Sequence, residues 1–214
     1  MARPRWAALA VLATITLAAC TGGGKAKTTA EGQVAETSTT APGPQVKAAR
    51  TLEELSRALD ITVPDGYVRQ PDSVDDTGPS DLEKAVSDDG GADARDVLTG
   101  DHFVRGYQRE WSLDEDDQII SYVYQFADPS GAGDYTRRVT EDSTAPTGSG
   151  DLGRFTVPGI DGAVGINGSD PNFASSTVTF AKGPYSVQVV VNGARPAGLQ
   201  SLVSSMAEEQ YDRL

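Results

Sequence analysis

Few residues in this chain have the types and spacing that catalysis needs. His102 is the only histidine, so a Ser-His-Asp site would have to use it, and no Gly-x-Ser-x-Gly turn presents a nucleophilic serine. With one histidine and one cysteine, Cys20, the chain also lacks the ligands of a zinc site. We therefore expect no catalytic residues, no metal and no cofactor. His102 itself is interpreted as a loop residue that precedes a strand.

The acidic residues at 114–117 (Asp-Glu-Asp-Asp) raise the question of calcium binding. An EF-hand loop needs a central glycine and a terminal glutamate, and this segment has neither. Acidic residues at 72–76 and 88–89 could add ligands in space, so weak calcium binding remains an alternative. We favour a solvated loop between two strands.

The most unusual segment is 103–111, Phe-Val-Arg-Gly-Tyr-Gln-Arg-Glu-Trp. Side chains alternate between the two faces of a strand, which places five residues on one face: Phe103, Arg105, Tyr107, Arg109 and Trp111. In a structural interpretation the arginine stems cover the aromatic rings and their charged heads reach the edge. In a functional interpretation this face lies opposite the helices and forms a concave surface for an apolar or anionic ligand. We favour the structural interpretation and keep these five residues as the candidate ligand surface.

The elements that must position these residues follow from the apolar periodicity. Helices are expected at 51–59, 80–86 and 94–98, from 129, and from 196 to the end of the chain. Strands are expected at 61–63, 103–113, 118–126, 155–157, 163–166, 176–181 and 185–192. The longer strands pair as two hairpins. This pattern predicts an α+β fold, with an antiparallel sheet of about five to seven strands and helices packed on one face.

The charge of the chain limits its partners. The net charge is −13, and the segment up to Cys20 holds two arginines and no acid, so the remainder carries −15. An acidic surface repels phosphate backbones and anionic headgroups. We therefore expect no nucleic-acid binding.

The N-terminal segment predicts export. Arg3 and Arg5 precede an uncharged apolar run at 6–19, which is too short to span a membrane but typical of a signal peptide. The run leads into Leu-Ala-Ala-Cys at 17–20, which resembles the lipobox of bacterial lipoproteins. The resemblance implies cleavage just before Cys20 and diacylglycerol on its sulfur. An ordinary signal peptide with an incidental cysteine is the alternative, but it leaves an unpaired thiol unexplained.

These observations divide the chain into three parts. Residues 1–19 form the expected signal peptide. Residues 20–49 hold the lipidated cysteine and a Thr/Gly/Ala/Pro-rich tether, which has no apolar periodicity and is expected to be disordered. Residues 50–214 form the expected single α+β domain.

The domain also resembles exported domains of actinobacterial envelope lipoproteins. The stretches that carry this resemblance are Phe-Val-Arg-Gly-Tyr at 103–107, Tyr-Gln-Phe at 124–126, Phe-Thr-Val-Pro-Gly at 155–159 and Gln-Tyr-Asp-Arg-Leu at 210–214. The order of elements is similar to the PsbP/Mog1-like sandwich, a fold used for binding more than for catalysis.

Our leading hypothesis is a non-enzymatic, membrane-tethered binding or interaction domain on the outer face of the cytoplasmic membrane. Its membrane contact would be the lipid on Cys20, and its partner an unknown envelope protein or an apolar small molecule. Two alternatives stay open. One is an envelope hydrolase with a carboxylate pair, and the other is a regulatory or sensor lipoprotein for a membrane kinase.

Overall fold

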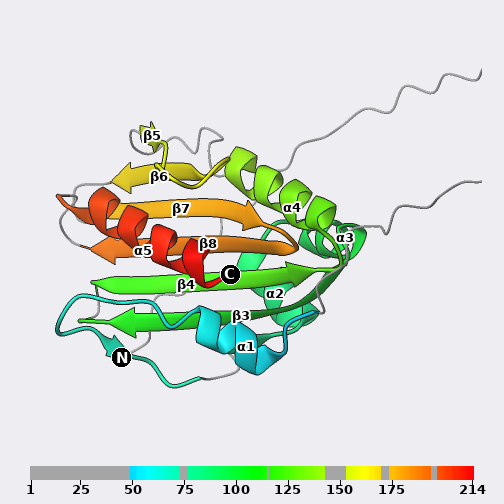
Figure 1. Ribbon diagram of the computed structural model, residues 1–214, viewed down its shortest axis with the longest axis horizontal. Helices are drawn as coiled ribbons and strands as arrows, with labels where there is room; N and C mark the ends of the chain where they lie inside the picture. Colours follow the sequence, from blue (N-terminus) through cyan, green and yellow to red (C-terminus); the bar gives the residue numbers. More distant parts are fainter. Residues whose placement is uncertain (1–48, 73–76, 115, 143–152, 170–173, 194–196) are drawn as a thin grey trace, which may run out of the picture. The chain divides into compact units, whose positions relative to one another are not determined.

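The computed structural model describes residues 49–72, 77–114, 116–142, 153–169, 174–193 and 197–214. The expected signal peptide, Cys20 and almost all of the expected tether lie outside these residues. The described part is built on one antiparallel sheet in the order β1-β3-β4-β8-β7-β6-β5, with β2 also paired to β3 (Figure 1). The strands are β1 (Val68–Arg69), β2 (Gly78–Ser80), β3 (Phe103–Ser112), β4 (Gln118–Phe126), β5 (Gly153–Phe155), β6 (Val164–Ser169), β7 (Ala174–Lys182) and β8 (Tyr185–Gly193). The α+β class and the antiparallel sheet are therefore confirmed, with eight described strands rather than five to seven.

Helices cover both faces of the sheet, where the sequence led us to expect one. The helices are α1 (Leu52–Ala58), α2 (Leu82–Asp89), α3 (Ala94–Gly100), α4 (Pro129–Asp142) and α5 (Leu199–Arg213). Figure 1 shows α1 and α5 crossing in front of the strands. The second helix layer is reflected in the burial pattern of β4. Consecutive residues from Val123 to Phe126 are all buried, which requires that both faces of this end of the strand are covered.

The core beneath α1 and α5 is the larger of two apolar clusters. It joins Leu55 and Leu59 with Val203 and Met206 over the valines of β8. A second cluster joins Tyr124 and Phe126 of β4 to α2, α3 and α4 through residues such as Ala85, Leu98 and Tyr135. The sheet is therefore the middle layer of the described domain.

The segment after α1 is not the strand expected at 61–63. Ile61 is buried in the core, but this segment pairs with no strand. The backbone N–H of Thr62 donates instead to the Glu209 carboxylate of α5, at 2.9 Å. The apolar pattern that indicated a strand reflects packing beneath a helix, which periodicity over three residues cannot distinguish.

The first described residues lie beside the end of the last helix. Arg50 donates through Nη2 to the Leu214 backbone oxygen at 2.9 Å, and its guanidinium lies 5.4 Å from the centre of the Tyr185 ring. Thr51 then starts α1 with a capping box, in which its side chain and that of Glu54 each bond the other's backbone N–H.

Candidate functional site

The five residues of the candidate ligand surface do not form one surface. Tyr107, Arg109 and Trp111 are buried on the face beneath α1 and α5. Phe103 pairs with Phe126 whereas Arg105 pairs with Gln125, so one extra residue bulges from β3 between them. This bulge turns Phe103 to the opposite face, against Tyr124 at 5.3 Å between ring centres. The functional interpretation of this strand is therefore wrong, because the face lies under helices rather than opposite them.

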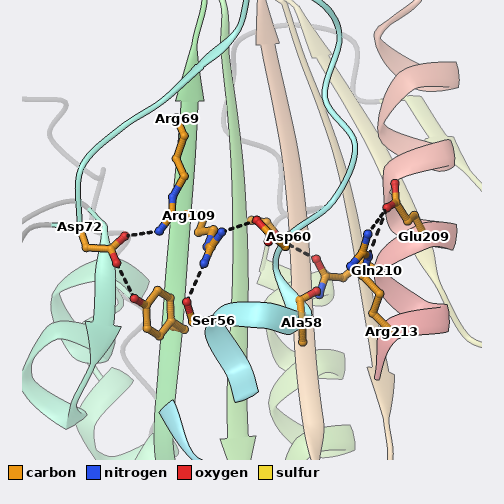
Figure 2. Close-up of polar contacts among 11 residues, drawn as sticks. Ser56, Ala58, Asp60, Arg69, Asp72, Arg109, Glu209, Gln210 and Arg213 are labelled. Atoms are coloured by element: carbon orange, nitrogen blue, oxygen red, sulfur yellow. Dashed lines mark hydrogen bonds and ion pairs between the residues drawn. The ribbon is translucent and has the colours of Figure 1, made fainter. Parts of the chain in front are cut away.

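Arg109 is a structural cation, but its charged head is buried and does not reach the edge that the structural interpretation expected. It is 4% exposed, and its guanidinium lies 6.0 Å from the centre of the Tyr107 ring. Figure 2 shows its head between α1 and the segment after that helix: Nη2 donates to Ser56 Oγ of α1 and Nη1 donates to Asp60 Oδ1 just beyond it, both at 2.6 Å. A buried guanidinium needs such partners, because leaving its charge uncompensated would be costly.

Tyr107 extends these contacts toward β1. Its hydroxyl donates to Asp72 Oδ2 at 2.6 Å, and Arg69 pairs with the other oxygen at 3.1 Å (Figure 2). Burial by itself would raise the pKa of Asp72, but the hydrogen bonds from Tyr107 and Arg69 outweigh it and lower that pKa. Burial and the bond to Asp72 raise the pKa of Tyr107, so its hydroxyl stays protonated and keeps donating.

Two side chains of α5 complete the contacts on this face. The amide of Gln210, which is 0% exposed, donates to the Ala58 carbonyl at 2.6 Å and accepts from Ser121 at 3.3 Å. Glu209 accepts from Thr62 and pairs with Arg213 at 2.6 Å (Figure 2). These contacts fasten α1 and the segment after it to the sheet and to α5, which is a structural role.

A pocket of 220 Å³ opens on the opposite face. It lies where the end of α2 and the middle of α4 meet strands β4, β7 and β8. Its lining combines aromatic rings, charged groups, hydroxyls and an amide: Asp88, Asp89, Tyr122, Tyr124, Tyr135, Arg138, Val139, Thr179, Ser186 and Gln188. We take this pocket as the candidate functional site of the described domain.

The two carboxylates of the pocket stand in the last turn of α2. Gly90 ends this helix in the left-handed conformation, with φ at 68°. A negative charge at a helix C-terminus is unfavourable, because the helix macrodipole is already negative there. Asp88 is an exposed residue as a whole, but the side chains of Asp88 and Asp89 are only 15% and 5% exposed. They need cationic partners from outside the last turn.

Each carboxylate has such a partner. Lys84, one turn earlier in α2, lies 2.7 Å from Asp88 and also donates to Gln108 on β3. Arg138 of α4 pairs with Asp89. Two cations therefore balance the two carboxylates, and these ion pairs fix the walls of the pocket.

Two tyrosine hydroxyls bind the carboxylates of the pocket. Tyr135 donates to Asp89 at 3.0 Å, and Tyr124 donates to Asp88 at 3.3 Å. Burial raises the pKa of both tyrosines well above the ordinary value, and the negative carboxylates raise it further. Both hydroxyls are therefore protonated donors across the physiological range.

The floor of the pocket is a polar part of the sheet. Tyr122 of β4 pairs with Gln188 of β8, which pairs with Thr179 of β7. The amide of Gln188 donates to Thr179 at 3.4 Å, a long and therefore weak hydrogen bond. Ser186 bonds Thr136 of α4 at 2.7 Å, which holds the helix against the floor.

Sequence reasoning found parts of this site without joining them. It expected a strand at 118–126, which holds Tyr122 and Tyr124, and it considered the acidic residues at 88–89 only as possible ligands for calcium. The signal that could have joined them is the pair of acids in the last turn of α2, where the macrodipole disfavours them. The contact between that turn and α4 is a tertiary fact, which periodicity does not contain.

The other residues singled out from the sequence lie elsewhere. His102 is exposed in the turn between α3 and β3, with φ at 60°. Asp114 closes the loop between β3 and β4 by accepting from the backbone N–H groups of Asp116 and Asp117. Within the described ranges, no three His, Cys, Asp or Glu residues gather as metal ligands. In that same part of the chain, no helix is long and apolar enough to cross a membrane.

Comparison with known proteins supports the fold. The chain matches no family model, and no curated protein matches it significantly. One solved structure with a similar fold is the extracellular domain of PknH from Mycobacterium tuberculosis, at a TM-score of 0.51 and 10% sequence identity. The match covers 77% of this chain and 98% of that one. At this identity the likeness concerns the arrangement of helices and strands.

Proposed function

We propose that this chain is a lipid-anchored extracytoplasmic binding domain that holds a small polar ligand in the pocket between α2, α4 and the sheet. The observation that carries the proposal is the pair of carboxylates in the last turn of α2. They stand against the helix macrodipole, mostly buried, and two cations hold them at the wall of a formed pocket. Conflicts with local rules of this kind are characteristic of binding sites.

Binding fits this pocket better than catalysis. A hydrolase that works through a carboxylate pair needs the two groups in different roles, such as an acid that is protonated beside a base or nucleophile that is ionised. Here both carboxylates have the same kind of partner, a cation, so the structure does not divide them into an acid and a base. The pocket is also below the ~300–1,000 Å³ that is usual for drug-sized ligands, so its ligand is small.

The anchor in this proposal is Cys20, on the evidence of the lipobox and the apolar run before it. A diacyl group gives stable attachment, because each buried CH₂ contributes about 0.8 kcal/mol. Replacing the cysteine, Cys20→Ser, is expected to abolish labelling by a palmitate analogue and to move the chain out of the membrane fraction. A chain that stays in the membrane after this change would remove lipidation from the proposal.

The binding function is tested by native mass spectrometry of the full chain, purified in mild detergent from its own envelope. We expect an added small mass in the native spectrum that disappears on denaturation. The variant Tyr122→Ala should lose this mass, whereas Thr177→Val, on the same sheet face but outside the pocket lining, should keep it. A chain without added mass in every preparation would count against a resident ligand.

A sensory role is a second candidate. The likeness to the extracellular domain of PknH, a kinase, favours it because that domain shares the layered fold over almost its whole length. A lipoprotein of this kind would pass ligand occupancy to a membrane kinase. In-cell crosslinking should then recover a kinase, and the yield of this crosslink should change with Tyr122→Ala. An unchanged yield would mean that contact with the kinase does not depend on ligand binding in the pocket.

A further inference from the structure

We propose that the ligand of this pocket is a neutral polyhydroxylated ring, such as a single sugar residue or a cyclic polyol. This inference rests on the proposed binding function and names the chemistry of its ligand. The pocket offers three kinds of surface within 220 Å³: compensated charges, a polar floor and tyrosine rings. The first two kinds each exclude a class of ligand, and the third favours a ring.

Charge balance excludes a charged ligand. Asp88 is neutralised by Lys84 and Asp89 by Arg138. An ammonium or carboxylate group on the ligand would bring one uncompensated charge against four groups that are largely removed from water, at a high desolvation cost. A neutral ligand adds no charge, and its hydroxyls can accept hydrogen bonds from the arginine and donate to the carboxylates, the stronger charge-assisted kind.

The floor excludes a purely apolar ligand. Thr179, Ser186 and Gln188 line the floor with hydroxyl and amide groups, and an apolar ligand would displace water from their remaining donors and acceptors without offering a hydrogen bond in return. The Gln188 amide is the most adaptable of these groups, because its bond to Thr179 is long at 3.4 Å. It can turn to a ligand at little loss, and it offers both a donor and an acceptor.

The tyrosines favour a ring with an apolar face. The rings of Tyr122 and Tyr124 stand at 78° to each other with centres 6.5 Å apart, and Tyr135 is tilted at 50° to Tyr124 at 5.8 Å. Tyr124 and Tyr135 are nearly buried, so Tyr122, which is half-buried, presents the ring surface to a ligand. A sugar can lay its C–H face on such a ring and direct its hydroxyls at the polar floor, which matches the mixed character of tyrosine.

The test uses saturation-transfer NMR on the full chain with defined probes. The neutral probes are D-glucose, methyl α-D-glucopyranoside and myo-inositol, with D-glucosamine, D-glucuronate and cyclohexanol as charged and apolar counterparts. We expect transfer to the neutral polyols and about tenfold weaker binding of the counterparts, which equals a loss of about 1.4 kcal/mol. The natural ligand could be the end of a glycan or a free sugar, and a glucose hexasaccharide distinguishes these two sources. Transfer that is confined to its terminal residue indicates a glycan end. Binding of the monosaccharide alone indicates a free sugar.

Matched variants locate the binding. Thr179→Val removes a hydroxyl from the pocket floor, whereas Thr177→Val makes the same change two residues away on the same strand face, outside the pocket lining. The first should weaken polyol binding about tenfold and the second should leave it unchanged, a difference of one good hydrogen bond. Tyr122→Phe keeps the ring and should bind better than Tyr122→Ala. Thermal unfolding of each variant shows whether it is folded.

Two results would overturn the inference. Preferred binding of glucosamine, glucuronate or cyclohexanol at Thr179 would leave the binding function standing and refute the ligand class. Absence of any probe binding, in a protein whose native mass spectrum shows a bound mass, would refute it in the same way. A protein with neither probe binding nor bound mass would refute the proposed function as well.

Discussion

At the scale of single residues, the ion pair between Arg109 and Asp60 is the most instructive, because one side chain is buried and the other is exposed. Arg109 is 4% exposed, whereas the side chain of its partner Asp60 is 63% exposed. The two ends of one ion pair therefore differ in what their loss leaves behind. Removing the arginine leaves a hydrated carboxylate, and removing the carboxylate leaves a buried cation.

We predict that Asp60→Ala lowers the free energy of unfolding by about 1–3 kcal/mol, although Asp60 is a surface residue, because Arg109 loses its carboxylate. Urea denaturation measures this change. Glu53→Ala is the matched control, since its pair with Arg57 lies in the same region with both side chains exposed, at 81% and 68%, and should cost less than about 0.5 kcal/mol. Equal effects in the two variants would mean that water reaches Arg109 in solution.

At the scale of elements, α4 depends on one close approach. A Cβ on Gly131 would lie 2.0 Å from the backbone carbonyl oxygen of Asp101, after α3, whereas a Cβ on Gly133 would meet nothing within 4 Å. Both glycines belong to the first turns of the same helix. Only one of them is required by its surroundings.

This contrast gives a paired prediction. Gly133→Ala should raise the free energy of unfolding by about 0.5–1 kcal/mol, because alanine is the better helix former and restricts the unfolded chain. Gly131→Ala should lower it by about 1–3 kcal/mol, because backbone must shift to admit the methyl group. Thermal and urea unfolding of both variants measure the effect. Stabilisation by both would show that α3 and α4 are farther apart in solution.

The sequence predicted the helices and strands better than it predicted which side chains lie on which face of the sheet. The two long hairpins, the capping box at Thr51 and the closing helix are local patterns, and each is present. The bulge before Arg105 was not predictable, because one inserted residue reverses the face of Phe103 without changing the composition of the strand. The pocket was missed for a related reason, since it depends on which helix ends against which strand.

At the scale of the whole domain, carboxylates fasten segments that are far apart in sequence. Burial would raise the pKa of Glu209, but hydrogen bonds from Arg213 and Thr62 outweigh it and lower that pKa below its ordinary value of 4.5. Asp72 is lowered below 3.8 in the same way by Tyr107 and Arg69. A carboxyl with a lowered pKa stabilises the fold above its unfolded pKa, and that contribution disappears as the pH falls through the folded pKa.

We therefore predict that the melting temperature, measured by circular dichroism, is nearly constant from neutral pH to about pH 5 and falls below that, as these carboxyls protonate. Asp101 opposes this trend, because burial and the nearby Asp134 charge raise its pKa. Glu209→Gln should lower the melting temperature at neutral pH and make its fall in acid shallower. An unchanged acid slope in this variant would show that Glu209 is not a main contributor.

The contact between Arg50 and Leu214 has a topological consequence. Because Arg50 reaches the Leu214 backbone oxygen at 2.9 Å, residues 50 and 214 lie at one corner of the domain. A short peptide could join them and close the domain into a ring, and the tight turn at Gly183 could be cut to create new ends. In such a permuted chain the proposed lipid-bearing segment would join the domain at the turn between β7 and β8 instead of beside the end of α5.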